Sequence, residues 1–469
     1  MKKKRIIFML ALVIVLAFSF SSIAAQGQSG TAAPGAWGSS VNLQNTGTAT
    51  ATINIQFYDS SGTLAHTYTP APLAAGDALS IYVPGVVTGL GAGQYSAVVS
   101  SDQPVVASVN SASTNSGSAP WTAFAYDGFS SSQAGTTLYF PGNYKNYYNF
   151  SSEIVIQNTG ATVATVTATF KKADGTVIAS NVALGTIQPN ASKTYPMSSF
   201  TQLPSGNADG LFSAVISSDQ PVVGVANIWR EQPTNGTASY SAFTGGSSTL
   251  YAPALYNNYY GFASALTIQN VGTGTAAGTV TYSNGVTDTF SLAEGAAQEF
   301  YQPANSSLPS GNTNGVFAAS VTTTSGSVVG LVSLSLPSGS NGDFASYNVP
   351  ATASPSVNIP NINSDYYGYF SAVTVQNTGT QSTNVTITYA DGSSRVFNNV
   401  PAGGVVNIVH LNGAGDVLPN RTSTSATVTS SNGVNLVAVI QHNTTNGVSG
   451  YDPNKKPSDF LLAVTGVSQ

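Results

Sequence analysis

A phrase built around the dipeptide Gln-Asn recurs four times along the 469-residue chain, and this repetition constrains the fold more than any other feature. The four copies begin at Gln44, Gln157, Gln269 and Gln376, at intervals of 113, 112 and 107 residues. A second phrase follows each copy and is best matched between residues 95–110 (YSAVVSSDQPVVASVN) and 212–227 (FSAVISSDQPVVGVAN). A period of this size corresponds to a whole domain, because solenoid repeats span only about 20–50 residues. The sequence therefore predicts four copies of one domain.

Within each copy the apolar residues alternate with polar ones. Residues 164–170 place Ala, Val, Ala and Phe at every second position with Thr between them, which is typical of a strand with one buried face. Asp174-Gly175 follows this segment, and such pairs favour tight hairpin turns. Residues 217–221 (SSDQP) separate two further apolar runs and predict another hairpin. Each copy is therefore predicted to be an immunoglobulin-like β-sandwich of about seven or eight short strands, and the protein to be all-β.

The N-terminus has the three parts of a secretory signal peptide. Residues 2–5 are basic, residues 6–20 are apolar, and small residues follow as far as Ala25. An apolar run of about 15 residues is shorter than the roughly 20 that a membrane-spanning helix needs. We therefore expect cleavage near Ala24 or Ala25, no membrane span after cleavage, and an extracellular or cell-surface location.

The predicted organisation is a rod of four sandwiches. The expected segments are a signal peptide (1–25), a Gly/Ala/Ser-rich leader (26–36) and sandwiches at 37–142, 143–255, 256–361 and 362–469. These boundaries assign the short apolar strand before each junction, such as residues 137–141 (TLYFP), to the preceding sandwich. The alternative assigns this strand to the following sandwich. That arrangement would leave the first sandwich open to a strand from another molecule.

Charged side chains make up only 7% of the chain, and cysteine is absent. These values exclude a dense basic face for nucleic acid and any cysteine-based metal site or disulfide framework. His66, His410 and His442 share no motif, and most aspartates lie in turn sequences. We therefore expect no enzyme activity, no cofactor and no nucleic-acid partner. Calcium binding by carbonyl, Asp and Asn oxygens stays open. Few charges also mean little repulsion between copies, so self-association is expected.

Tyrosine and asparagine are concentrated at the three junctions. The candidate site residues are Tyr147, Tyr148, Tyr259, Tyr260, Tyr366 and Tyr367. One hypothesis is a glycan platform for a cell-envelope polysaccharide, because tyrosine rings stack on sugar rings and asparagine hydrogen-bonds hydroxyls. The other is that the rings pack between consecutive sandwiches. Position at the joints favours packing, and the two roles are compatible.

The repeated unit resembles the immunoglobulin-like modules of secreted bacterial surface proteins. The resemblance is carried by residues 268–272 (IQNVG), Tyr282 and Asn284-Gly285. The acidic, cysteine-free composition, rich in Ser, Thr, Gly and Asn, is similar to that of surface-layer proteins. The resemblance implies a sandwich fold and an extracellular setting, and it brings no catalytic residues. The expected function is a non-catalytic structural subunit of a cell-surface layer, sheath or filament, with an adhesin or carbohydrate-binding surface protein as the alternative.

Overall fold

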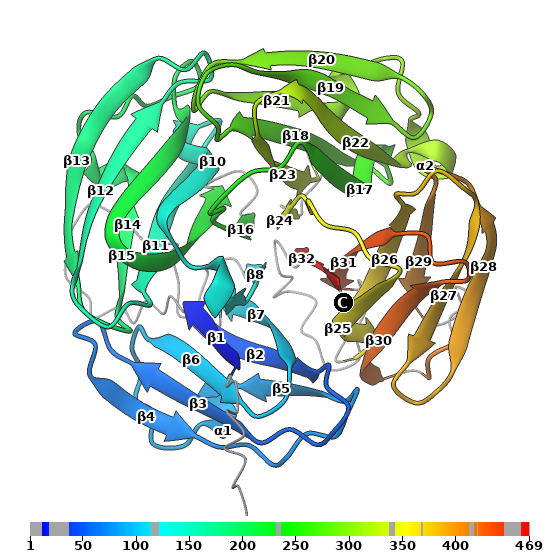
Figure 1. Ribbon diagram of the computed structural model, residues 1–469, viewed down its shortest axis with the longest axis horizontal. Coiled ribbons are helices and arrows are strands. Elements are labelled where there is room, and N and C mark those ends of the chain that lie inside the picture. Colours follow the sequence, from blue (N-terminus) through cyan, green and yellow to red (C-terminus); the bar gives the residue numbers. More distant parts are fainter. Residues whose placement is uncertain are drawn as a thin grey trace, which may run out of the picture.

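Four β-sandwiches follow one another around a closed ring in the computed structural model of the chain (Figure 1). The structure describes residues 12–17, 37–113, 122–230, 236–336, 343–366, 369–411, 417–419, 421–444 and 461–468. Within these ranges the strands pair antiparallel throughout, which confirms the all-β prediction. The helical elements described are short: α1 (Val83–Val86), α2 (Gly311–Asn314), η1 (Ser131–Gln133), η2 (Met197–Ser199) and η3 (Gln302–Ala304).

The strands fall into four units along the chain. Unit 1 contains β1 (Leu12–Ala17), β2 (Trp37–Asn45), β3 (Ile53–Tyr58), β4 (Leu64–Tyr68), β5 (Ala78–Tyr82), β6 (Ser96–Ser101), β7 (Val105–Ser113), β8 (Ala123–Asp127) and β9 (Phe129–Ser130). Unit 2 contains β10 (Gly135–Tyr147), β11 (Phe150–Asn158), β12 (Ala164–Lys171), β13 (Val177–Ile187), β14 (Ser192–Pro196), β15 (Leu211–Arg230) and β16 (Thr237–Ser241). Unit 3 contains β17 (Thr249–Tyr259), β18 (Phe262–Asn270), β19 (Ala276–Tyr282), β20 (Thr287–Leu292), β21 (Ala297–Tyr301), β22 (Val316–Ser325), β23 (Val328–Ser335) and β24 (Phe344–Asn348). Unit 4 contains β25 (Ser356–Ser364), β26 (Tyr369–Asn377), β27 (Thr383–Tyr389), β28 (Ser394–Val400), β29 (Val405–His410), β30 (Thr422–Ser430), β31 (Leu436–Thr444), β32 (Leu462–Thr465) and β33 (Val467–Ser468).

Units 1 and 4 each have two separate sheets with the same strand order, and in units 2 and 3 the corresponding strands are joined into one continuous sheet. In unit 1 the orders are β4-β3-β6-β1-β9 and β5-β2-β7-β8, and in unit 4 they are β28-β27-β30-β25-β33 and β29-β26-β31-β32. This order differs from the predicted immunoglobulin type, whose sheets run A-B-E-D and C-F-G. Here the first strand of each unit pairs with the sixth strand of the same unit. The sequence did not predict this pairing, because an alternating apolar pattern indicates strands and their buried faces but not which strands become neighbours.

The alternating pattern itself is confirmed. Along β12 the residues alternate between buried and more exposed positions, as the sequence of residues 164–170 predicts. The hairpin predicted at residues 217–221 is wrong. β15 runs without interruption through this segment, pairing with β10 and β12 on one side of it and with β11 and β16 on the other. The SSDQP segment is therefore a corner at which one strand passes between the two sheets.

The strand at each junction belongs to the following unit, so the predicted domain boundaries are wrong. Leu138 of β10 pairs with Ile216 of β15, both within unit 2. β17 pairs in the same way with β22, and β25 with β30. The boundaries therefore lie near residues 131–134, 242–248 and 349–355, before the apolar strand rather than after it. The pairing partner decides this assignment, and the partner is distant in sequence.

Residues 12–17, inside the predicted signal peptide, form the first strand of unit 1. Ile14 of β1 pairs with Val99 of β6, in the register that Leu138 has with Ile216 in unit 2. On its other side β1 pairs with β9. The backbone pairing of unit 1 thus includes a segment that signal cleavage would remove.

The apolar cores form a closed cycle, so the units make a ring and the predicted rod is wrong. The core of unit 1 includes Trp229 of unit 2, and the core of unit 2 includes Phe344 of unit 3. The core of unit 3 includes Ala463 of unit 4, and the core of unit 4 includes Ala125 of unit 1. Because neighbouring units pack against each other in this way, some sheets are buried on both faces. Nearly every residue of β11 is therefore buried.

The repeated Gln-Asn phrase has a structural explanation. The Asn158 side chain donates to the carbonyl oxygens of Thr162 (2.7 Å) and Ile187 (2.9 Å) and accepts from the Gly160 N–H (2.8 Å). The corresponding asparagines, Asn45, Asn270 and Asn377, make the same three bonds. Because a buried amide needs all of these partners, the asparagine of the phrase is explained by folding alone.

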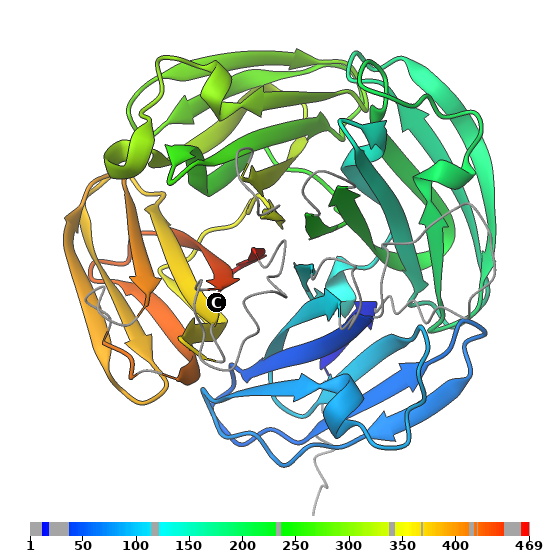
Figure 2. The same cartoon turned by 180° about the vertical axis from the view of Figure 1, so that it is seen from behind.

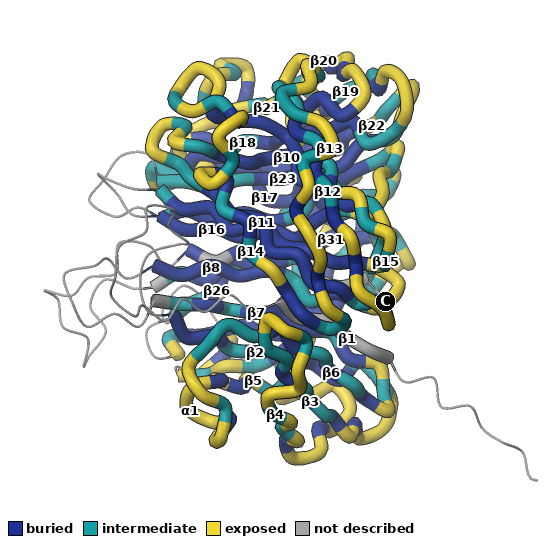
Figure 3. The backbone as a smooth tube through the Cα atoms, turned by 90° about the vertical axis from the view of Figure 1, so that its left-hand side faces the viewer, coloured by how far each residue is buried: buried dark blue, intermediate teal, exposed yellow. Residues whose placement is uncertain are grey.

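One end strand of each unit lies at the centre of the ring (Figures 1 and 2). β8, β16, β24 and β32 are end strands of their sheets, yet their described residues are almost all buried, because these strands pack against one another. The Thr237 hydroxyl donates to the Ala123 carbonyl oxygen (2.9 Å), which links β16 to β8. Figure 3 shows buried residues through the middle of the molecule and exposed ones around its periphery.

Candidate functional site

The predicted tyrosines lie on hairpins between the first two strands of each unit. Tyr147 is half-buried, and its ring lies 6.1 Å from that of Tyr144 and 4.8 Å from that of Tyr148. Tyr148 is 55% exposed and has a φ of 47°, in the left-handed region that an aromatic residue rarely adopts. Its N–H donates to Asn207 Oδ1 (2.8 Å), which holds the turn.

The next hairpin repeats this geometry. Tyr259 is half-buried and stacks on Tyr256 at 5.6 Å, whereas Tyr260 is 65% exposed with a φ of 50°. The Tyr260 N–H donates to Asn312 Oδ1 (2.7 Å). In unit 4, Tyr366 is partly exposed and follows Asp365, which has a φ of 47°, while Tyr367 lies outside the described residues.

The two tyrosines of each described pair therefore occupy different environments. Burial and the nearby Glu299 of unit 3 raise the pKa of Tyr147, so this ring lies at the joint between units 2 and 3. Burial raises the pKa of Tyr259, which hydrogen-bonds with Asn407 of unit 4. Tyr148 and Tyr260 instead present their rings to solvent. Packing accounts for the first tyrosine of each pair, and glycan binding by the second stays a prediction.

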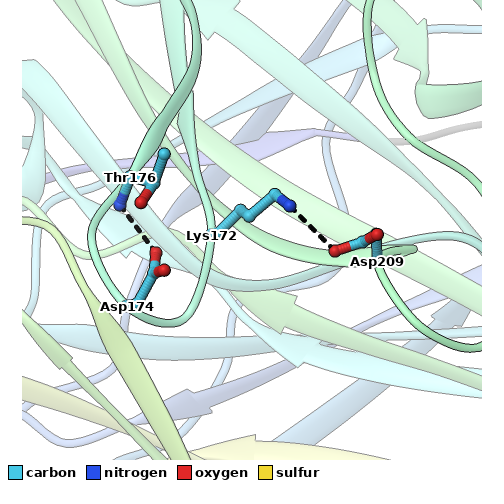
Figure 4. Close-up of polar contacts among 4 residues, drawn as sticks. All are labelled: Lys172, Asp174, Thr176 and Asp209. Atoms are coloured by element: carbon cyan, nitrogen blue, oxygen red, sulfur yellow. Dashed lines mark hydrogen bonds and ion pairs between the residues drawn. The ribbon is translucent and has the colours of Figure 1, made fainter.

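The aspartates in turn sequences have local roles. Asp174 Oδ1 accepts a hydrogen bond from the Thr176 N–H (2.8 Å), which lowers the pKa of the carboxyl group (Figure 4). The nearby Lys172 Nζ lies 2.9 Å from Asp209 Oδ1, with both side chains well exposed. Exposed pairs of this kind contribute about 0–1 kcal/mol. The turn interpretation is therefore sufficient for Asp174.

Sequence reasoning missed two buried carboxylates. Burial raises the pKa of Glu153 to about 7, and the Asn227 amide donates to its Oε1 (2.9 Å). Burial also raises the pKa of Asp127, to about 6, although the Thr465 hydroxyl and N–H donate to its Oδ2. For Glu153 a signal was present in the sequence, because the other copies of the repeated phrase have Ser40, Ala265 and Ala372 at this position and acids are rarely buried.

Asp127 lies on a central cavity of about 680 Å³ that all four units line. Ser241, Asn348 and Thr465 stand at corresponding places in the other three units. The Asn348 amide donates to the Ser241 carbonyl oxygen (2.6 Å), and the Ser241 hydroxyl donates to that of Asp127 (3.1 Å). Together with the bonds from Thr465 to Asp127, these contacts link the four polar residues in a chain that contains one carboxyl group.

Two histidines flank Ser371 in unit 4, an arrangement that the sequence did not indicate. Ser371 pairs with His410 on one side and with His442 on the other, and its Oγ lies 2.7 Å from His442 Nδ1. The corresponding Ser152 and Ser264 hydrogen-bond the backbone of the first strand, as Ser371 does. Because the same serine has the same structural role in three units, the Ser371–His442 contact is explained by folding.

The described residues contain no group of three or more His, Asp or Glu side chains that could hold a metal ion. Calcium binding therefore stays a prediction. Among the same residues, no helix has the length and hydropathy needed to cross a membrane.

No protein-family model and no curated protein matches the chain. Among solved structures, that of Thermotoga maritima 1070 is 19% identical and covers 23% of this chain and 93% of its own, with a TM-score of 0.20. The Anabaena sensory rhodopsin transducer is 22% identical and covers 19% of this chain and 92% of its own, with a TM-score of 0.17. The Streptococcus pneumoniae pilus protein RrgB is 9% identical and covers 92% of this chain and 86% of its own, with a TM-score of 0.12. At these TM-scores the likenesses carry no argument about fold or function.

Proposed function

We propose that the chain is a non-catalytic, exported structural protein, and that its four-sandwich ring is the repeating unit of a cell-surface layer, sheath or filament. The observation that carries this proposal is the position of four sheet edges. β4, β13, β20 and β28 are end strands and lie on the circumference of the ring (Figure 1). End strands carry backbone groups that can pair with another chain.

These rim strands have little protection against such pairing. Charges, prolines and bulges normally keep sheet edges apart. β4 and β13 contain no Lys, Arg, Asp or Glu, and β20 and β28 contain one each, Asp288 and Arg395. β13 and β28 are irregular along their pairing, whereas β20 pairs regularly with β19. β20 is therefore the edge best suited to contact a second ring.

The proposal is tested on protein recovered after export, by light scattering and negative-stain microscopy with and without calcium. We expect ordered sheets or filaments. The double variant Thr289→Lys/Ser291→Lys adds charge at exposed positions of β20 and should reduce assembly at least tenfold. The matched control, Thr279→Lys/Thr281→Lys, places the same charges on the adjacent interior strand β19 and should assemble normally. A ring that stays monomeric at high concentration would contradict the proposal.

A second candidate, a carbohydrate-binding surface protein or adhesin, is favoured by the exposed rings of Tyr148 and Tyr260. Both rings are held in a strained backbone conformation, and such strain is commonly retained at functional sites. Glycan binding by these two residues would act at the hairpins rather than at the rim, so it is compatible with assembly.

A further inference from the structure

The joint between units 4 and 1 differs from two other joints at one structurally equivalent position. Tyr144, Tyr256 and Asn363 occupy the same place in the first strands of units 2, 3 and 4. The N–H of each donates to a serine hydroxyl eight residues later. The acceptors are Ser152 (2.8 Å), Ser264 (2.9 Å) and Ser371 (2.8 Å).

The two tyrosines fill the joints in which they lie. Tyr144 and Tyr256 are only 6% and 4% exposed. The Tyr256 hydroxyl of unit 3 donates to Gln441 Oε1 of unit 4, so the ring spans the joint. Asn363 has a much shorter side chain, and beside it lies a cavity of about 240 Å³ lined by residues of units 1 and 4. We call this cavity the closure pocket.

The closure pocket is lined by side-chain amide oxygens that lack hydrogen-bond partners within the described part of the chain. Asn361 and Asn363 are 9% and 8% exposed, and neither Oδ1 has a hydrogen-bond partner within the described part of the chain. The Oδ1 of Asn110, from unit 1, likewise has no hydrogen-bond partner among the described residues. A buried polar atom without a partner destabilises a fold, so three of them around one cavity indicate a place for a polar ligand.

The residues around the closure pocket carry no charged side chain. Burial lowers the pKa of His442 to about 4, so this lining residue is neutral at physiological pH. An adjoining cavity of about 360 Å³ shares Asn361 and Tyr366 with the closure pocket and includes one acid, the exposed Asp77. Tyr82 and Tyr366 are 45% and 39% exposed, which places aromatic surface near the solvent-facing part of the pocket.

We propose that the closure pocket binds a neutral sugar. The amide oxygens of Asn361 and Asn363 accept hydrogen bonds from its hydroxyls, and the ring of Tyr366 packs on its apolar face. A charged ligand would bury its charge without a counter-ion, and an apolar ligand would leave the amides without partners. The adjoining cavity gives room for a second sugar residue. None of the residues that line the closure pocket belongs to a rim strand, so the proposal does not rest on ring assembly.

The test uses the exported protein and four probes: glucose, galactose, mannose and N-acetylglucosamine. Saturation-transfer NMR detects binding, and titration calorimetry measures Kd. We expect at least one probe to bind. Asn363→Tyr, which restores the residue of units 2 and 3, should weaken binding at least tenfold while the melting temperature stays the same or rises.

A second variant protects the test against misfolding. Ser423→Val introduces the residue that pairs with the equivalent position in unit 3, where Tyr256 lies opposite Val316, and it should also weaken binding. Val163→Ala, at an exposed apolar residue outside the pocket, is the control and should bind normally. Absence of binding by all four probes, or unchanged binding by folded Asn363→Tyr protein, would overturn the proposal. Sugar binding by rings that do not assemble would support it and contradict the structural function separately.

Discussion

The hydroxyl of Ser425 in unit 4 donates a hydrogen bond of 3.0 Å to the carbonyl oxygen of Gly76 in unit 1, 349 residues earlier in the chain. The same serine of the second repeated phrase joins other consecutive units. These contacts run from Ser96 to the Asn190 carbonyl and from Ser213 to the Gly295 carbonyl. The joint that closes the ring, between units 4 and 1, thus has the same type of hydrogen bond as the joints between units 1 and 2 and between units 2 and 3.

This contact predicts a stability change at the closing joint. Ser425 is only 1% exposed, so Ser425→Ala removes a hydrogen bond donated by a buried hydroxyl and should lower the free energy of unfolding by about 1 kcal/mol. Unit 3 has Ala318 at the equivalent position, and Ala318→Ser should have the opposite effect at its joint. Urea unfolding measures both changes. Equal stability of the Ser425→Ala and original proteins would show that the contact contributes nothing.

Glu153 predicts an unusual pH dependence of stability. Burial raises its pKa in the folded state to about 7, compared with roughly 4.3 in an unfolded chain. The protonated form therefore favours folding, and its contribution, complete below about pH 4, is lost as the pH rises to about 7. The loss amounts to about 3 kcal/mol.

Glu153→Gln should remove this dependence and make the protein more stable than the original at pH 8. Melting curves between pH 4 and pH 8 compare the two proteins. Asp174→Asn, which changes an exposed turn acid, serves as the control for the loss of one charge. Parallel curves for the original protein and Glu153→Gln would contradict the assignment of a buried, protonated carboxyl group.

At the positions of the exposed tyrosines, we expect glycine to be better tolerated than alanine. Tyr148 and Tyr260 have left-handed backbones, so Tyr→Gly at either position should raise the free energy of unfolding by about 1 kcal/mol. Tyr→Ala removes the ring without relieving this strain and should change stability by less than about 0.5 kcal/mol. At the half-buried Tyr147, a change to alanine should lower the free energy of unfolding by about 1–2 kcal/mol.

Urea unfolding and a glycan array on the same variants separate packing from ligand binding. If the exposed rings bind glycan, both the Gly and Ala variants lose binding while remaining folded. Because both variants lack the ring, a Tyr148→Gly protein that is less stable than Tyr148→Ala would contradict the strain assigned to the left-handed backbone.

The position of β1 predicts that removal of the first 25 residues changes the hydrogen exchange of β6. Residues 12–17 pair with β6, so removal of residues 1–25 should expose the β6 edge. Amides of β6 should then exchange with solvent at least tenfold faster, as hydrogen exchange followed by mass spectrometry can measure. Amides of β15, which pair with β10 in unit 2, are the internal control. Equal β6 exchange in the two chains would show that another segment takes the place of β1.

The sequence predicted local structure well because local structure depends on alternation and turn residues. The strand at residues 164–170 and the turn at Asp174 follow directly from side-chain size and polarity. The ring could not be predicted in this way, because residues at the joints, such as Trp229, have the same apolar character as those inside a sandwich. The strand β8, with Ala on one face and aromatic residues on the other, was the available signal, since an end strand that is apolar on both faces must be covered.

The candidate site was predicted only in part, for a similar reason. The junction tyrosines stood out by composition, but exposure separates Tyr147 from Tyr148 and depends on the hairpin geometry. Asn363 gave no signal on its own. It becomes informative only when strand pairing aligns it with Tyr144 and Tyr256, and that pairing is a property of the fold.

Fusion of the four units into one chain removes exact symmetry from the ring. In a ring of four identical subunits, a substitution at one joint would appear at every joint, and a pocket would occur four times. Here Ala318 alters the joint between units 3 and 4, and Asn363 alters the joint between units 4 and 1. One joint can therefore diverge while others hold the ring together, and the expected stoichiometry at the closure pocket is one ligand per ring.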